Sequence, residues 1–211
     1  MTDYITLQNR IAKEVRFVDT AAQSDIAPDI RNAIRSAIKY YENDRFWFNE
    51  SQWNQDTASN AEYIDLPAEA LEIDSLRLTE PSGSRRTLNP ATFQWIDGAQ
   101  SGSPFTGPPS RYCVYGRRLR LWPVPDAAYT LTLSGLQRLD DLVVNTDANA
   151  WTNECEELIR FRAKADLYAN ILHDPQQAAA LSAYADQVLY PKFIGRATQL
   201  ISSGRVEPQW W

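Results

Sequence analysis

The sequence predicts an α+β fold: an α-helical bundle built from both chain ends, with an inserted small antiparallel β-sandwich or β-barrel domain. Apolar residues recur at helical spacing near both ends of the chain, whereas in the middle they alternate with polar residues as in half-buried strands. A length of 211 residues suits one domain with a sizeable insertion, and no internal repeat is found. The simplest architecture is therefore a bundle with a β-domain inserted between its helices.

These changes of pattern divide the chain into four parts. Residues 1–45 are expected to form the N-terminal helices of the bundle, and residues 46–149 the inserted β-domain. Residues 150–204 are expected to form the C-terminal helices of the bundle, and residues 205–211 an extended C-terminal tail.

The first region has two helical patterns. Leu7, Ile11 and Val15 are spaced by four residues, which indicates one apolar stripe. Pro28 then lies where a second helix is expected to begin, because proline is favoured in a first helical turn. The residues that follow give the clearest helical periodicity of the chain: Ile30, Ala33, Ile34, Ala37, Ile38 and Tyr41.

The middle region contains about six short strand patterns, enough for a small sandwich or a partly closed barrel. The runs "RFWFNES", "AEYIDLP" and "LEIDSLRLTE" are rich in strand-forming residues, and "PSGS" predicts a turn after the last of them. The segment "NPATFQWIDG" predicts one or two helical turns opened by Asn89 and Pro90 and closed by Gly98.

The stretch "YGRRLRLWPVPDAAYTLTLSG" predicts two strands separated by prolines, which cannot donate to a sheet. Leu119 alternates with Arg118 and Arg120, so we expect the leucine on the core face and the arginines on a solvated face. Gly116 can supply a tight hairpin turn before the first strand. The second strand repeats the alternation with Tyr129, Leu131 and Leu133.

The third region returns to helical spacing. Thr152 or Asn153 can cap a helix, whose first turn carries three glutamates that favour a helix N-terminus. Pro191 is expected to kink or end the last helix. The predicted apolar faces are Leu158, Phe161, Ala165, Tyr168 and Leu172, and then Leu181, Tyr184, Ala185, Val188 and Leu189.

Composition and charge exclude several classes of function. The formal net charge of -6 disfavours a general nucleic-acid groove, although DNA could still slide past such a surface. We expect no signal peptide, because the first residues are neither basic nor apolar, and no membrane span, because no run approaches ~18 apolar residues. Cys113 and Cys155 are expected to be reduced, buried thiols rather than a disulfide, as in a protein made in a cytoplasm.

No catalytic or metal-binding constellation is found, so we expect no enzyme, no metal and no cofactor. His173 is the single histidine and lies between two expected helices beside a capping aspartate. No nucleophile elbow, phosphate-binding loop or dinucleotide fingerprint is present. Acidic residues have structural explanations: Asp140 and Asp141 in a polar turn, and Glu154, Glu156 and Glu157 at a helix start.

The C-terminal tail has no evident use for the protein alone. Gly204 and Pro208 interrupt helical structure, and the chain ends with Trp210 and Trp211. Two aromatic side chains on a loose terminus are costly in a monomer and useful as anchors in the pocket of a partner. The alternative is that both indoles fold back onto the bundle.

The order of these segments resembles the adaptor, or head-to-tail connector, proteins of tailed bacteriophages. The resemblance covers nearly the whole chain and rests on "FWFNES", "EYIDLPAEALEIDSLRL" and "YCVYGRRLRLWPVPDAAYTLTLSG", between a helical start and a helical close. It implies a structural virion protein, made in the host cytoplasm, that forms a ring, commonly of twelve copies, beneath the portal of the filled head. The ring would extend the DNA channel without specific DNA binding and present a platform for the next tail or nozzle protein.

In this family the C-terminal segment often reaches the portal, which suggests a portal-binding site carried over by its terminal position. The residues of this segment are Arg205, Val206, Glu207, Pro208, Gln209, Trp210 and Trp211. An alternative function is a carbohydrate- or protein-binding β-sandwich module of a phage tail, in which Trp47, Trp53 and Trp122 would form a sugar platform. A small hydrolase or nuclease is a further alternative.

Overall fold

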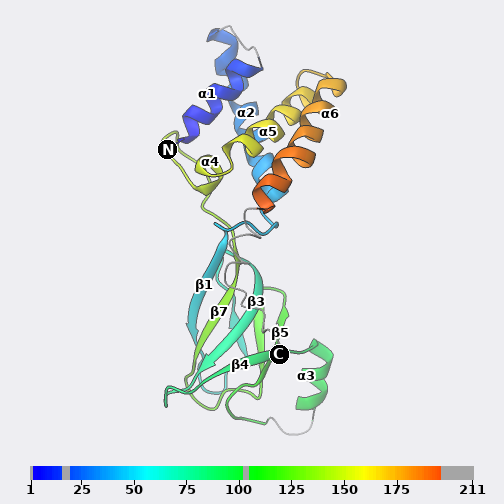
Figure 1. Cartoon of the computed structure of the whole chain (residues 1–211). Helices are drawn as coiled ribbons and strands as arrows, with labels where there is room; N and C mark the ends of the chain where they lie inside the picture. Colours follow the sequence, from blue (N-terminus) through cyan, green and yellow to red (C-terminus); the bar gives the residue numbers. More distant parts are fainter. Residues whose placement is uncertain (1, 16–19, 102–104, 196–211) are drawn as a thin grey trace, which may run out of the picture. The chain divides into compact units, whose positions relative to one another are not determined.

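A computed structural model describes residues 2–15, 20–101 and 105–195 of the chain, with the side chains of residues 20–25 left aside (Figure 1). By its internal contacts the chain divides into two compact units. The helical unit comprises Met1–Asn49 and Leu139–Trp211, and the β unit comprises Glu50–Arg138. The fold is therefore of the mixed α+β class that the sequence predicts.

In the helical unit, helices from both chain ends share one apolar core. Helix α2 packs against α5, α5 packs against α6, and α1 contacts both α2 and α5. Ile11 and Ile34 from the first part of the chain belong to the same buried cluster as Trp151 and Leu158 from the last part. The helices are α1 (Tyr4–Glu14), α2 (Thr20–Tyr41), α4 (Ala150–Asn153), α5 (Glu156–Asn170), α6 (Pro175–Tyr184) and the π-helix η1 (Ala185–Leu189).

Two helix starts differ from the sequence-based expectation. Helix α2 begins at Thr20, so Pro28 lies inside it rather than at its start, and the packing of the following apolar face outweighs the one backbone hydrogen bond that proline removes. Thr152 does not cap α5. Asn149 caps the short helix α4 instead, accepting from the Thr152 backbone N–H while Thr152 accepts in return, a reciprocal capping box.

The last helix does not end at Pro191. The five residues of η1 adopt the wider π pattern, and helical backbone resumes over residues 190–195. A π segment changes the hydrogen-bonding register just before the proline, which has no N–H to donate. Ala185 and Leu189 are buried as expected, whereas Tyr184 and Val188 remain exposed on the outer face of the helix.

The β unit is one curled seven-stranded sheet with the order β1-β7-β3-β4-β5-β6-β2, and not a two-sheet sandwich (Figure 1). All neighbouring strands pair antiparallel except β4 and β5, which pair in parallel, so the sheet is mixed rather than purely antiparallel. The strands are β1 (Glu50–Asp56), β2 (Tyr63–Asp65), β3 (Ala70–Thr79), β4 (Arg85–Pro90), β5 (Arg111–Tyr115), β6 (Arg118–Trp122) and β7 (Thr130–Gln137).

The concave interior of the sheet holds the core of the β unit. The two strands predicted from residues 115–135 are β6 and β7, which lie apart in the sheet, and the prolines between them belong to neither strand. Leu119, Leu131 and Leu133 are fully buried, as predicted for the core face of these strands. Gly116, with φ of 62°, forms the tight turn between β5 and β6.

Helix α3 (Phe93–Gln100) follows β4. Its presence agrees with the prediction from "NPATFQWIDG", but its first residues differ: Asn89 and Pro90 belong to β4, and the helix is capped by Thr92, whose hydroxyl accepts from the Trp95 backbone N–H. Strand β3 bulges opposite β7, with register shifts around Ile73. Gly135 of β7 faces this bulge.

Candidate interaction sites

The predicted portal-binding segment, Arg205–Trp211, lies outside the residues that the structure describes. Its role therefore stays a prediction. The remaining candidate residues all lie in the described part of the chain, and their surroundings show which of them are structural and which are free for a partner.

Arg120 of β6 does not lie on a solvated face, contrary to the prediction from alternation. It is only 5% exposed and donates a hydrogen bond to Glu62. It also donates to the Asp97 carboxylate at 3.3 Å and to the Gln100 side-chain oxygen at 3.2 Å. Its guanidinium also lies 4.5 Å from the centre of the Phe93 ring. Helix α3 therefore covers this face of β6, and Arg120 is a structural anchor for the helix.

The positive charge of the buried Arg120 is compensated by carboxylates of the β unit. Burial disfavours the charged guanidinium, but the hydrogen bond and charge of Glu62, with a further contribution from Asp97, outweigh this and raise the pKa of Arg120 above its usual value. Burial also raises the pKa of the nearby Cys113 thiol. Such a thiol is neutral and inert.

Arg118 and Arg117 are exposed and hold local structure. Arg118 forms an ion pair with Asp65 of β2, at 2.8 Å, and its side chain is 63% exposed. Arg117 donates to the backbone carbonyl oxygens of Pro67 and Ala68, at 2.7 and 2.9 Å, and so fixes the loop after β2. Of the three arginines in "YGRRLRL", Arg118 thus matches the solvated face that was predicted.

An open pocket of about 610 Å³ adjoins these arginines. The rings of Phe93 and Tyr115 lie 4.6 Å apart in its wall, and Tyr115 is 62% exposed. Aromatic residues and arginines together are typical of the centres of protein interfaces. The lining residues are Tyr63, Asp65, Phe93, Tyr115, Gly116, Arg117 and Arg118.

A second aromatic cluster includes Trp95 of α3 and Trp122 of β6. The Trp122 ring contacts Trp95 edge to face at 5.0 Å, and Phe105 lies 6.2 Å away. The guanidinium of Arg111 covers the Trp95 ring at 4.5 Å. Trp95 and Phe105 remain exposed. Of the residues suggested for a sugar platform, Trp47 packs against the core of the helical unit and Trp53 against that of the β unit.

In the helical unit, a polar network joins α2, α5 and η1. Asp186 accepts a hydrogen bond from the Tyr41 hydroxyl at 2.6 Å and from Arg162 at 3.0 Å. Arg162 also donates to the Ser182 hydroxyl at 3.0 Å and lies over the Tyr40 ring at 3.6 Å. The sequence pattern did not reveal this network, because Arg162 and Asp186 lie on helices at positions that read as ordinary polar ones.

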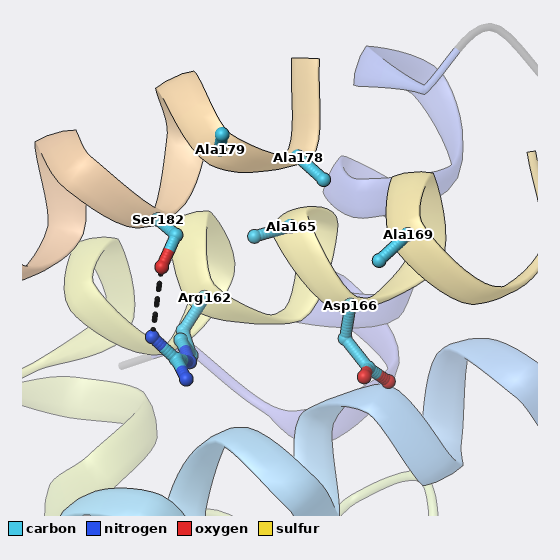
Figure 2. A pocket seen from close by; sticks show the side chains of 7 residues that line it. All are labelled: Arg162, Ala165, Asp166, Ala169, Ala178, Ala179 and Ser182. Atoms are coloured by element: carbon cyan, nitrogen blue, oxygen red, sulfur yellow. Dashed lines mark hydrogen bonds between the residues drawn. The ribbon is translucent and has the colours of Figure 1, made fainter. Parts of the chain in front are cut away.

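Figure 2 shows a small pocket of about 300 Å³ next to this network, between α5 and α6. Alanines from the two helices face each other across it, Arg162 closes one end through Ser182, and the Asp166 carboxylate points away from α6. Asp166 accepts a hydrogen bond from Asn170. The arrangement is a packing gap between two helices with small side chains, and the Ser182 hydroxyl at its edge accepts from Arg162 and donates to Asp186 at 3.4 Å. The lining residues are Arg162, Ala165, Asp166, Ala169, Ala178, Ala179 and Ser182.

The other titratable candidates have structural surroundings. His173 is exposed, with φ of 52°, at the junction of α5 and α6, where Asp174 caps α6 by accepting from the Gln177 backbone N–H. Glu156 pairs with Arg10 of α1 at 2.7 Å. Asp140 and Asp141 are exposed in the segment before α4. Within the described ranges, no group of three or more His, Cys, Asp or Glu side chains could hold a metal ion, and Cys113 and Cys155 are buried thiols that form no disulfide.

Comparison with known proteins identifies a family. A family model described as SU10 adaptor protein matches residues 2–204, which include both units of the chain. No curated protein matches the sequence. Among the described helices, none combines the length and apolar character that a membrane crossing needs. The match confirms the resemblance drawn from the sequence motifs, and the chain belongs to the SU10 adaptor protein family, the structural adaptor proteins of tailed phages.

Proposed function

We propose that the protein forms a ring that joins the portal of the DNA-filled head to the tail and extends the DNA channel. The family match over residues 2–204 carries this proposal, because it spans the helical unit and the β unit and therefore includes both structural parts of an adaptor. The copy number expected from the resemblance is twelve. The net charge of -6 suits a passage through which DNA has to move without being retained.

Exposed apolar side chains on both units support a role in assembly. In the helical unit, Val143, Val144 and Val188 are each more than half exposed, and in the β unit Phe105 and Tyr115 are about 60% exposed. Neighbouring exposed apolar side chains, such as Val143 and Val144, are the kind of surface that subunit contacts cover. Contacts with neighbouring copies, the portal and the next tail or nozzle protein would account for this exposure.

We further propose a division of labour along the chain. The helical unit forms the body of the ring subunit, and the β unit, Glu50–Arg138, offers a platform to the tail. Residues 205–211 extend from the body and bind the portal through Trp210 and Trp211.

A measurement of assembly mass tests the ring. The purified chain is studied by mass photometry, alone and after mixing with the portal protein of the same phage. We expect a large assembly whose mass is an integer multiple of the subunit mass, either alone or on the portal. A chain that stays monomeric in both samples would overturn the proposal.

A second candidate function is favoured by the pocket lined by Tyr63, Phe93 and Tyr115. Its aromatic walls and its arginine rim suit a protein- or carbohydrate-binding module of a phage tail. A glycan array and a binding assay with tail proteins discriminate the two functions, because binding by a chain that never forms a ring would favour this alternative.

A further inference from the structure

Helix α2 presents a row of positive charge to solvent. Arg31, Arg35 and Lys39 are exposed and follow one another every four residues, about 6 Å apart along the helix axis. Asn32 and Ser36, also exposed, lie beside them. We call these five residues the α2 stripe. The opposite face of the helix is buried in the core of the helical unit: Ile30, Ala33, Ile34, Ala37 and Tyr41.

The cations of the stripe have no carboxylate partner within the ranges that the structure covers. Other cations of the helical unit do: Arg10 pairs with Glu156, and Lys164 with Glu14. Like charges spaced by four residues repel each other along a helix. Between Ile26 and Tyr41 the sequence supplies one acidic residue, Asp29, so this part of α2 is positive in a chain whose net charge is negative.

The composition of the α2 stripe indicates whether its anionic partner is a protein or a nucleic acid. The exposed residues from Arg31 to Lys39 are arginine, asparagine, serine and lysine, without an apolar side chain among them. Interfaces between proteins are built around apolar and aromatic anchors and are poor in lysine. Phosphate groups of nucleic acids, in contrast, are bound by arginine, lysine, asparagine and serine side chains.

We propose that the α2 stripe contacts the phosphate backbone of double-stranded DNA and is the channel-facing surface of the helical unit. The inference rests on the proposed function, which brings DNA through the ring, and it names the surface that the DNA meets. Contacts to phosphate alone carry no sequence information, so they are compatible with DNA that moves along the channel. The negative charge of the remaining chain limits how tightly each copy holds the duplex.

Salt dependence gives a quantitative expectation. Three cations that each neutralise one phosphate give a slope of about -2.7 when the logarithm of the affinity is plotted against that of the salt concentration. Between about 50 and about 200 mM salt, the affinity of the chain for DNA is then expected to fall by up to roughly 40-fold. A surface that made no phosphate contact would show no such dependence.

The experiment measures binding of the full-length chain to a short, fluorescent DNA duplex of mixed sequence by anisotropy at low salt. The test variant carries Arg31→Gln, Arg35→Gln and Lys39→Gln. The control variant carries Arg77→Gln, Arg85→Gln and Lys192→Gln, which change the net charge by the same amount at exposed positions elsewhere. Melting temperatures verify that both variants fold. We expect the test variant to lose at least tenfold in affinity and most of the salt slope, and the control variant to bind nearly as well as the wild type.

Three results would overturn the proposal: no salt-dependent binding by the wild type, equal affinities of the wild type and test variant, or equal losses in the two variants. A test variant that binds DNA normally but fails to assemble would instead identify the stripe as a contact between proteins. Assembly and portal attachment are measured on the same samples. If the wild type forms no ring while its DNA binding still depends on the stripe, the ring function fails and the DNA contact stands.

Discussion

The hydroxyl of Tyr41 donates a hydrogen bond of 2.6 Å to the carboxylate of Asp186. Tyr41 is the last residue of α2, and Asp186 belongs to η1, so the bond joins helices from the two ends of the sequence. Burial, followed by the hydrogen bond and the negative charge of Asp186, raises the pKa of Tyr41. The raised pKa keeps the tyrosine a neutral hydrogen-bond donor at neutral pH.

Replacing Tyr41 by Phe tests how much this hydrogen bond contributes to the free energy of unfolding. The ring and its packing remain, but Asp186 loses one donor, so we expect the free energy of unfolding to fall by about 1–2 kcal/mol. The control is Tyr40→Phe, the same chemical change at the neighbouring residue, which is exposed and offers its ring rather than its hydroxyl to Arg162. Chemical denaturation compares the two variants, and equal stabilities would contradict the assigned role of Asp186.

The ion pairs between α1 and α5 predict a dependence of stability on pH. Burial alone would raise the pKa of Glu14, but the hydrogen bond and charge of Lys164, together with Arg160, outweigh it and hold the pKa below its ordinary value of 4.5. A lowered pKa in the folded state contributes stability that is present above the ordinary pKa and is lost as the pH falls through the lowered value. We therefore expect the helical unit to lose stability as the pH is taken below about 4.5.

The variant Glu14→Gln removes the ionisable group that causes this pH dependence of stability. It should be less stable than the wild type at neutral pH, and the difference between the two should shrink as the pH is lowered. Asp141→Asn serves as the control. This substitution also removes one negative charge, but from an exposed carboxylate in the segment before α4. Urea unfolding curves between pH 7 and pH 3 supply the measurement. A constant difference between Glu14→Gln and the wild type would show that the ion pairs are not the cause.

Arg120 and Arg118 differ sharply in their surroundings although only Leu119 separates them. Removing Arg120 in an Arg120→Met variant leaves Glu62 and Asp97 without their partner beneath α3, and we expect a loss of about 2–4 kcal/mol in the β unit. Arg118→Met breaks one exposed pair with Asp65 and should cost less than about 1 kcal/mol. Thermal unfolding ranks the two, and a larger effect at Arg118 would reverse the assignment.

Gly135 of β7 is required by the bulge in β3. A Cβ atom placed there would overlap the backbone carbonyl of Glu72 and lie 3.0 Å from the Cα of Ile73, neither of which can rotate away. We expect Gly135→Ala to destabilise the β unit by about 3 kcal/mol or more, as strong overpacking does. Gly98→Ala in α3 is the matched control. It has open space around it and should be neutral or slightly stabilising, because alanine favours helix.

These residues show what local sequence patterns predict and what they leave open. Alternation along β6 correctly places Leu119 in the core, because a strand has a fixed period of two. It did not predict the burial of Arg120, since period two says which side chains share a face and not whether another element covers that face. The cover is α3, and its contacts come from a separate part of the chain.

Helix boundaries illustrate the same limit. The spacing of Ile30, Ile34 and Ala37 predicted the buried face of α2, but the preference of proline for a first turn placed its start eight residues too late, at Pro28 instead of Thr20. Thr152 has the right residue type for a cap and acts as the partner of the cap, Asn149. Long-range packing and reciprocal side-chain bonds decide such details.

The last prediction concerns the C-terminal tail, Arg205–Trp211, proposed as the portal-binding segment. Buried tryptophans at an interface typically contribute 2 kcal/mol or more each, and ordering of the segment offsets part of this gain. Deleting residues 205–211 should therefore weaken attachment to the portal by about 100-fold or more while leaving the melting temperature nearly unchanged.

The double variant Trp210→Ala with Trp211→Ala should reproduce most of this loss of attachment. The control within the same segment, Val206→Ala with Gln209→Ala, should not. Surface plasmon resonance with immobilised portal measures these effects. A truncated chain that melts well below the full-length protein and still binds the portal normally would place the two indoles in the core of the chain itself, because only a loss of internal packing lowers stability without affecting attachment.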